Sequence, residues 1–305
     1  MNASERTSKS RRKHNWRSYA EDYLFMLPYL IIFFVFTVLP VVVAIILSFT
    51  YFNVLETPIF NGIDNYIHLI VDDSLFMKAL KNTLLFSVIT GPIGFFLSLL
   101  LAWLINEFGP KTRAFLTLLF YAPTISGGAY MIWQIIYSGD SYGYLNGILI
   151  NLNLIYSPIQ WTTEEKYMIV AAMILIIWMS FGAGFLSFVA GFKNIDQKLY
   201  EAAAVDGLRN RWQELWYITL PTMKPQLMFG AVMSITGAFG MGDVISGVFG
   251  FPSTNYTLHT LVHHLQDYGN TRYEMGYACA IAVILFLIMV GANQLVQRIL
   301  RGVGE

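Results

Sequence analysis

Long apolar runs alternate with shorter polar segments along almost the whole chain. Six of the runs hold about 20 or more mostly apolar residues, the length that a helix needs to cross a bilayer. They lie at about residues 24–50, 83–106, 114–138, 167–192, 226–250 and 275–297. The pattern predicts an all-α integral membrane protein with six spans in residues 23–305, preceded by a polar, basic tail at residues 1–22.

The overall composition fits a protein whose main solvent is lipid. Of the 305 residues, 56% are hydrophobic and only 12% are charged, and the mean hydropathy is +0.54. Soluble domains carry roughly 25% charged residues. The first apolar run is too long for the core of a signal peptide, so we expect it to be retained as a span. The net charge of zero argues against a nucleic-acid partner, and the single Cys279 cannot form a disulfide within the chain.

The basic residues fall mainly on one side of the six predicted spans. Fifteen of the 19 lysines and arginines lie in the N-terminal tail, after spans two and four, and after span six. The positive-inside rule makes this side cytoplasmic. Because an odd number of spans would remove the segregation, we expect a multi-pass protein of the cytoplasmic membrane with both termini in the cytoplasm.

A polar insert at residues 193–224 separates the fourth span from the fifth on the predicted cytoplasmic side. Asn194 and Gln197 have the spacing of a capping box, and Gly207 is typical of a left-handed helix stop. One face of the helix between them holds Leu199, Ala202, Ala203 and Asp206. The insert is therefore predicted to contain a capped, alanine-rich helix.

A second short helix is predicted at about residues 209–219, before Pro221 and Pro225. Its stacked side chains are Trp212, Leu215, Trp216 and Thr219. The two helices form either a compact knob that docks a partner or an amphipathic pair that lies on lipid headgroups. The residues alone leave both interpretations open, although Glu201 and Asp206 would be repelled by an anionic leaflet.

The insert resembles the cytoplasmic EAA loop of permease subunits of binding-protein-dependent ABC importers. That loop reads E-A-A-x-x-x-G, a spacer, and then I-x-L-P, and here the spacer is one residue longer than usual. The resemblance implies that the loop seats in a cleft of an ATPase subunit. It assigns ATPase docking to Glu201, Ala202, Ala203, Asp206, Gly207, Ile218, Leu220 and Pro221.

The resemblance covers the chain from about Tyr23 and implies the six-helix type I importer fold with a cytoplasmic coupling helix. Leu27-Pro28-Tyr29 and the run at residues 275–280 resemble the larger subunit of maltose/glycerol-phosphate-type carbohydrate importers. The implied function is a transmembrane channel for a carbohydrate, with an oligosaccharide as the leading candidate. The implied partners are a second, homologous permease, two ATP-binding subunits and an extracytoplasmic solute-binding protein.

Small, hydroxyl-bearing and aromatic residues recur in the third, fourth and fifth spans, where a saccharide path needs them. The residue types alone place Tyr121 and Thr124 in the third span and Trp178 in the fourth as candidates. Gly230, Ser234, Gly237 and Met241 share one face of the fifth span. By the resemblance, sugar-contacting positions fall at or beside Met179, Ser180, Ser234, Ala238 and Met241.

Two alternatives apply to these path residues. The small residues also suit ordinary helix packing, and the aromatic side chains also suit a lipid-facing surface. Asp243, at the outer end of the fifth span, is costly there unless it is paired or hydrated. A functional role and a water-facing position are both open for it.

Other functions have weaker support. The same architecture would serve another solute such as glycerol phosphate, and a membrane enzyme or scaffold is a further alternative. The chain has no nucleotide-binding motif and no catalytic constellation, so we expect no enzymatic activity, no cofactor and no catalytic residue. His259 and His263 are four residues apart on a helical pattern, but no acidic or cysteine ligand lies beside them at helical spacing, so we expect no metal site.

Overall fold

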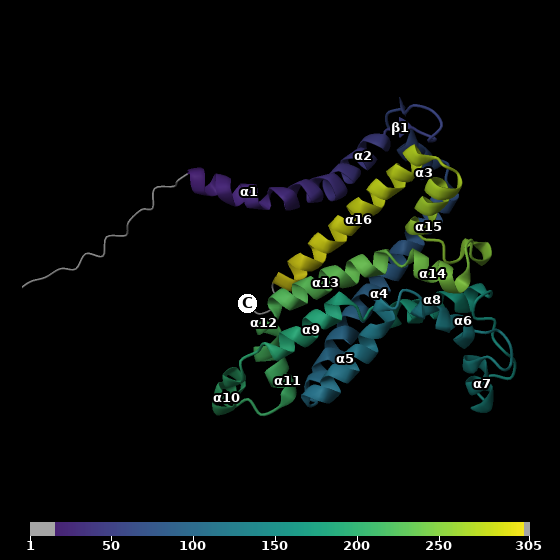
Figure 1. Ribbon diagram of the computed structural model, residues 1–305. Helices are drawn as coiled ribbons and strands as arrows, with labels where there is room; N and C mark the ends of the chain where they lie inside the picture. Colours follow the sequence, from purple (N-terminus) through teal and green to yellow (C-terminus); the bar gives the residue numbers. More distant parts are fainter. Residues whose placement is uncertain (1–15, 302–305) are drawn as a thin grey trace, which may run out of the picture.

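The computed structural model describes residues 16–301 and is mostly helical (Figure 1). Its elements are α1 (Trp16–Phe33), η1 (Phe34–Val38), α2 (Leu39–Leu47), β1 (Thr50–Tyr51), β2 (Ile59–Phe60), α3 (Asp64–Val71), α4 (Ser74–Asn106), α5 (Pro110–Ile125), η2 (Ala129–Met131), α6 (Ile132–Ile136), α7 (Tyr144–Asn151), α8 (Glu165–Trp178), α9 (Ala183–Lys193), α10 (Gln197–Val205), α11 (Arg211–Glu214), η3 (Leu215–Thr219), α12 (Leu220–Thr222), α13 (Lys224–Phe239), α14 (Gly242–Phe249), η4 (Thr254–Tyr256), α15 (Leu261–Gln266), η5 (Asp267–Thr271) and α16 (Met275–Arg301). The predicted tail at residues 1–22 lies mostly outside the described residues, and α1 begins at Trp16, before the predicted first span.

Three segments of the described chain are long and apolar enough to span a membrane by themselves: residues 23–47, 74–106 and 275–300. Three bent pairs of helices pass the same test together, which gives up to six spans. The predicted third, fourth and fifth spans correspond to these three bent pairs. α5 and the η2–α6 segment meet at 88°, α8 and α9 at 42°, and α13 and α14 at 44°.

Glycines lie at all three breaks. The sharpest bend follows Ser126, where Gly127 has a φ of +63° that few other residues adopt. Gly182 interrupts the chain between α8 and α9, and Gly240 ends α13. Two wide π-helical turns end two residues before a proline, η1 before Pro40 and η3 before Pro221. A π turn before a proline fits its missing N–H group, which cannot continue the α-helical ladder.

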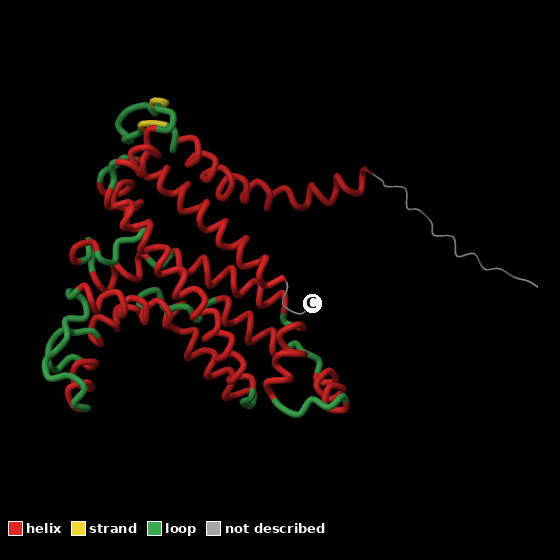
Figure 2. Tube along the Cα trace, turned by 180° about the vertical axis from the view of Figure 1, so that it is seen from behind, coloured by secondary structure: helices red, strands yellow, loops and turns green. Residues whose placement is uncertain are grey.

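The centre of the bundle is formed by α4, α9, α13 and α16, which lie close together in both views (Figures 1 and 2). Small residues allow this approach. A Cβ atom on Gly184 would lie 3.3 Å from the backbone of Gly230. A Cβ atom on Gly94 would lie 2.7 Å from the Oγ of Ser180. Part of the predicted small-residue stripe therefore packs helix against helix, as the alternative interpretation stated.

The first span stands apart from the centre of the bundle. Its most apolar window has no buried residue, whereas a third of the corresponding window in α4 is buried. α2 lies beside α16, and α1 extends away from the other helices (Figure 1). α10 and α11 lie at one end of the bundle, and β1, α3 and α15 lie at the other (Figure 1). We call the second end the outer end.

Candidate functional site

A central cavity of about 160 Å³ lies between the helices where the fourth and fifth spans are broken. Its walls come from α4, α5, the α8–α9 break, and α13 with its C-terminal break. The lining residues are Thr90, Thr124, Ile176, Met179, Ser180, Gly182, Ala183, Gly184, Met233, Ser234, Gly237, Ala238 and Met241. The cavity thus combines apolar walls with a few hydroxyl groups, which is the usual make-up of a small-molecule site.

The hydroxyl groups of the cavity are held by the backbone. Ser180 Oγ donates to the carbonyl of Ile177 at 2.7 Å, and Thr124 Oγ1 donates to the carbonyl of Phe181 at 3.1 Å. Thr90 Oγ1 donates to Phe86 at 2.7 Å. Each hydroxyl oxygen keeps lone pairs that accept further hydrogen bonds. The lining therefore presents oriented acceptors to a ligand with hydroxyl groups.

Seven of the ten path residues predicted from the sequence line this cavity. They are Thr124, Met179, Ser180, Ser234, Gly237, Ala238 and Met241. Tyr121 packs against the core cluster around Phe185 and Phe188, and Trp178 stacks edge-on against Trp133 at 5.7 Å. Those two side chains do not line the cavity, and Asp243 lines a different one at the outer end.

Sequence reasoning missed the contributions of Thr90, Ile176 and Met233 to the cavity. Thr90 lies two residues before Pro92 in a helix that was assigned no path role. A polar residue at the centre of an apolar span is a signal that would have singled it out. Gly230 was predicted on the path face, but it packs against the ring of Phe188, where an added Cβ atom would clash.

The insert at residues 193–224 folds as a capped helix, although its first cap was predicted wrongly. The side chain of Asp196 caps α10 by accepting from the backbone N–H of Lys198 at 3.0 Å, whereas Asn194 ends α9. At the other end, Gly207 has a φ of +97° and donates to Ala204, and Leu208 donates to Ala203. These two bonds are those of a Schellman stop, so the glycine prediction is confirmed.

The second half of the insert is anchored to the bundle. Asn210 caps α11 by accepting from Gln213 N–H at 2.8 Å. Arg211 forms an ion pair with Glu107 at the end of α4, at 3.3 Å. Trp212 packs on Trp103 with ring centroids 5.1 Å apart. The helix that was predicted to run to residue 219 continues through Pro221 and breaks at Met223.

α10 and η3 of the insert expose apolar side chains beside acidic groups. Val205 is 88% exposed and Trp216 is 66% exposed, while Glu201 and Asp206 are also exposed. Ala203 faces inward and is buried. Such surface is typical of an interface that another macromolecule covers.

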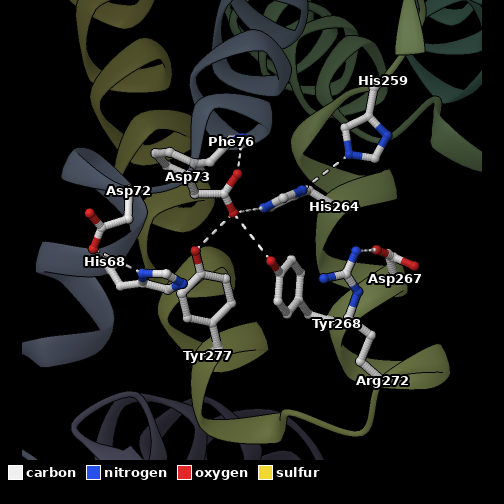
Figure 3. Close-up of polar contacts among 10 residues, drawn as sticks. All are labelled: His68, Asp72, Asp73, Phe76, His259, His264, Asp267, Tyr268, Arg272 and Tyr277. Atoms are coloured by element: carbon white, nitrogen blue, oxygen red, sulfur yellow. Dashed lines mark hydrogen bonds and ion pairs between the residues drawn. The ribbon is translucent and has the colours of Figure 1, made fainter. Parts of the chain in front are cut away.

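At the outer end, the carboxylate of Asp73 gathers four hydrogen-bond donors (Figure 3). They are Phe76 N–H at 2.8 Å, His264 Nε2 and the Tyr277 hydroxyl, each at 2.9 Å, and the Tyr268 hydroxyl at 3.4 Å. Burial acts to raise the pKa of Asp73, but these hydrogen bonds and His264 outweigh it and lower the pKa. Asp73 thus ties the start of α4 to α15, η5 and α16.

The histidines of the outer segment are hydrogen-bond partners of the protein itself. His264 Nδ1 lies 3.1 Å from His259 Nε2, and Thr260 N–H donates to His263 Nδ1 at 3.1 Å. Burial lowers the pKa of His259 to about 3 and also lowers the pKa values of His263 and His264. All three rings are therefore neutral at pH 7. Their hydrogen bonds fix the segment at residues 253–271.

Comparison with known proteins identifies similar chains. The family model for the inner membrane component of binding-protein-dependent transport systems matches residues 22–305. The probable ABC transporter permease protein YesP of Bacillus subtilis is 32% identical over 288 residues, which are 92% of this chain and 89% of that protein. The arabinooligosaccharides transport system permease protein AraP of the same species is 31% identical over 273 residues, 88% of this chain and 85% of that protein.

A solved structure has a similar fold. It is a bacterial ABC transporter involved in the import of the acidic polysaccharide alginate. One of its chains superposes with a TM-score of 0.73 and 27% sequence identity, covering 93% of this chain and 98% of that one.

Proposed function

The chain belongs to the family of inner membrane components of binding-protein-dependent transport systems, and from this premise we propose that it is the larger permease subunit of a carbohydrate importer. As an ABC transporter permease it is a multi-pass protein of the inner membrane. In this proposal the chain forms half of the channel, and the energy comes from ATP hydrolysis by separate subunits.

The observation that carries the proposal is the central cavity at the breaks of the fourth and fifth spans. Its hydroxyl groups and its unwound backbone at Met179–Gly182 suit a ligand that presents many hydroxyl groups. Irregular backbone inside a membrane protein is tolerated where it lines a cavity. The cavity is smaller than the roughly 300–1,000 Å³ of most ligand pockets. We infer that a second, homologous permease supplies the opposite wall.

The lining favours a carbohydrate over a phosphate ester. Among the described residues that line the cavity there is no lysine or arginine to pair with a phosphate group. The name of the relative AraP refers to arabinooligosaccharides, and the alginate transporter also carries a saccharide. An oligosaccharide import path is therefore preferred to a glycerol phosphate path.

The insert suits docking of an ATPase. α10 projects at the end of the bundle opposite β1 and α15 (Figure 1), and its turn exposes Glu201, Val205 and Asp206. The basic residues Lys193, Lys198 and Arg209 lie at this same end, so we place it, together with both termini, in the cytoplasm. The outer end then meets a solute-binding protein.

The experiment is reconstitution of the importer. The chain is expressed with the candidate second permease, ATPase and binding protein encoded beside it and purified through a tag on this chain. We expect one copy of the chain per complex, and ATP hydrolysis in proteoliposomes that a neutral oligosaccharide such as arabinotriose stimulates and glycerol phosphate does not. An active complex with two copies of this chain would contradict the heterodimer. Stimulation by glycerol phosphate alone would contradict the carbohydrate assignment.

A further inference from the structure

A second cavity, of about 320 Å³, opens at the outer end of the bundle. It is lined by Asp243, Ser246, Phe251, Gln266, Asn270 and Thr271, none of which lines the central cavity. The two cavities adjoin along the chain, because Met241 lines the central one and Asp243 the outer one. The Cα atoms of residues two positions apart are separated by at most roughly 7 Å. The walls of the two cavities therefore meet at this turn of the chain.

Phe251 offers one face of its ring to this outer cavity. Its ring stacks on those of His259 and His263, with centroid distances of 5.9 Å and 5.5 Å. The centroids of the two histidine rings are 5.9 Å apart. Histidines on opposite faces of Phe251 would be farther apart, so both lie on the same face. Both histidines are buried, whereas Phe251 is 43% exposed. The other face of Phe251 is therefore available to the apolar C–H face of a sugar ring.

Polar groups surround this ring face in fixed orientations. The amide nitrogen of Gln266 donates to Asp243 Oδ1 at 2.8 Å, so the Gln266 carbonyl oxygen is not used in this bond and can accept another. Because His263 Nδ1 accepts from Thr260, its proton is on Nε2, which lies 3.0 Å from the Gly242 carbonyl and 2.9 Å from Ser246 Oγ. The Gly242 carbonyl and Ser246 Oγ share this N–H group as acceptors, so the Ser246 hydroxyl hydrogen is not used by His263 and can be donated.

We propose that the outer cavity is a saccharide subsite that holds one neutral glycosyl unit next to the unit in the central cavity. The inference rests on the proposed function and adds a second position along the path. The stacking face of Phe251 and the donors and acceptors of Ser246, Gln266 and Asp243 suit a hydroxylated ring. The Asp243 carboxylate repels a uronate, and no lysine or arginine is among the described residues that line the cavity.

The test measures protection of a cysteine in the reconstituted complex. Thr271→Cys in a Cys279→Ala background is labelled with a cationic, water-soluble thiol reagent, with and without a trisaccharide. Arabinotriose and maltotriose are the neutral probes, and trigalacturonate is the acidic probe. We expect a neutral trisaccharide to slow labelling roughly three- to tenfold, the effect of one stacked ring, and trigalacturonate to leave the rate unchanged.

Aromatic variants identify the source of the protection. Phe251→Ala and the milder Phe251→Leu should abolish it. The matched control is Tyr256→Ala, because Tyr256 is similarly exposed (41%) and its ring also touches His259, yet it lies outside the cavity. Any of three outcomes overturns the subsite. Trigalacturonate protects as well as a neutral trisaccharide, no trisaccharide protects, or the protection survives both Phe251 variants.

The same complex separates failure of the subsite from failure of the proposed function. A trisaccharide that stimulates ATP hydrolysis without protecting the Thr271→Cys variant refutes the subsite and leaves the importer standing. Absence of stimulation by every saccharide refutes the proposed function itself.

Discussion

The phenol oxygen of Tyr200 lies 2.8 Å from the hydroxyl oxygen of Thr219, which joins α10 to the helix that leads into the fifth span. Thr219 also donates to the carbonyl of Glu214 at 3.1 Å, so Tyr200 is the donor in the pair. Next to Thr219, Leu220 belongs to the core cluster that contains Phe188. If an ATPase docks on α10 as proposed, we expect a displacement of α10 to reach the helices that line the central cavity through this contact.

Replacing Tyr200 by Phe removes this hydrogen bond and keeps the ring. A hydrogen bond within a protein contributes about 1 kcal/mol, so we expect oligosaccharide-stimulated ATP hydrolysis by the reconstituted complex to fall roughly fivefold. Tyr217→Phe, at an exposed tyrosine of the same insert, is the control. An unchanged rate in Tyr200→Phe would show that this contact does not transmit the coupling.

Gly207→Pro tests the helix stop of the insert. The backbone φ of Gly207 is +97° and proline fixes φ near −65°, so the Schellman turn cannot form. We expect the complex to insert normally but to lose saccharide-stimulated ATP hydrolysis. Gly207→Ala, which costs about 1–2 kcal/mol at a positive φ, should give a partial loss. Gly109→Ala, at a loop glycine with an ordinary φ and open space, is the control.

Cysteine scanning tests the path face of the fifth span. In a Cys279→Ala background, cysteines at 234, 237 and 241 should react with a water-soluble thiol reagent because those positions line the central cavity. Cysteines at 232 and 235 should react slowly, as should one at 230, because Gly230 abuts Phe188. Equal reactivity at all six positions would mean that α13 does not line a water-filled path.

Gly94 and Ser180 form a packing pair that a double mutant tests. A Cβ atom on Gly94 would lie 2.7 Å from Ser180 Oγ, so Gly94→Ala should lower the free energy of unfolding by about 1–3 kcal/mol through overpacking. Adding Ser180→Gly should restore part of the loss. Gly291→Ala, at a helical glycine with no atom within 4 Å, is the control. Thermal unfolding in detergent measures the effect, and an absence of rescue would rule out this contact as the cause.

The outer histidine cluster predicts that stability depends on pH. Burial keeps the pKa of His259 at about 3 and lowers that of His264, and both face Asp73, with Lys78 and Arg272 nearby. In the unfolded chain these histidines take up protons below their ordinary pKa of about 6.5, whereas in the folded chain each takes up its proton only at a lower pH. Stability should therefore be full above about pH 6.5 and fall as the pH drops toward 3.

Asp73 adds to the acid sensitivity, because its lowered pKa contributes stability that is lost as the pH falls below about 4. Thermal midpoints measured between pH 7 and pH 4 should fall less steeply in His259→Gln than in the unchanged chain. The exposed histidine variant His68→Gln is the control. If the thermal midpoints of all three proteins fell equally with pH, the buried His259 would not be a source of the acid sensitivity.

The sequence by itself determined the class of the protein. Apolar periodicity predicted a membrane protein, and the resemblance carried by the Glu201–Gly207 and Ile218–Pro221 motifs implied the permease family and the type I importer fold. The resemblance at Leu27-Pro28-Tyr29 and residues 275–280 implied a carbohydrate importer, and these interpretations are confirmed. The stop at Gly207 was also readable, because a positive φ is a local property that favours glycine. A short stretch of sequence was sufficient here because the turn depends only on neighbouring residues.

Only the tertiary structure decided where the spans break and which side chains meet. Gly127 marks a place where the chain can bend, but the 88° angle after α5 is not encoded in the hydrophobic periodicity. The contact of Gly230 with Phe188 depends on how neighbouring helices pack, so the periodicity does not reveal it either. The same holds for the Asp73–His264 pair, whose members are 191 positions apart in the chain. His259 and His263 resembled a metal-binding pair by spacing, yet their nitrogens are used by Thr260, Gly242 and His264. Long-range packing selects among the roles that a local pattern allows.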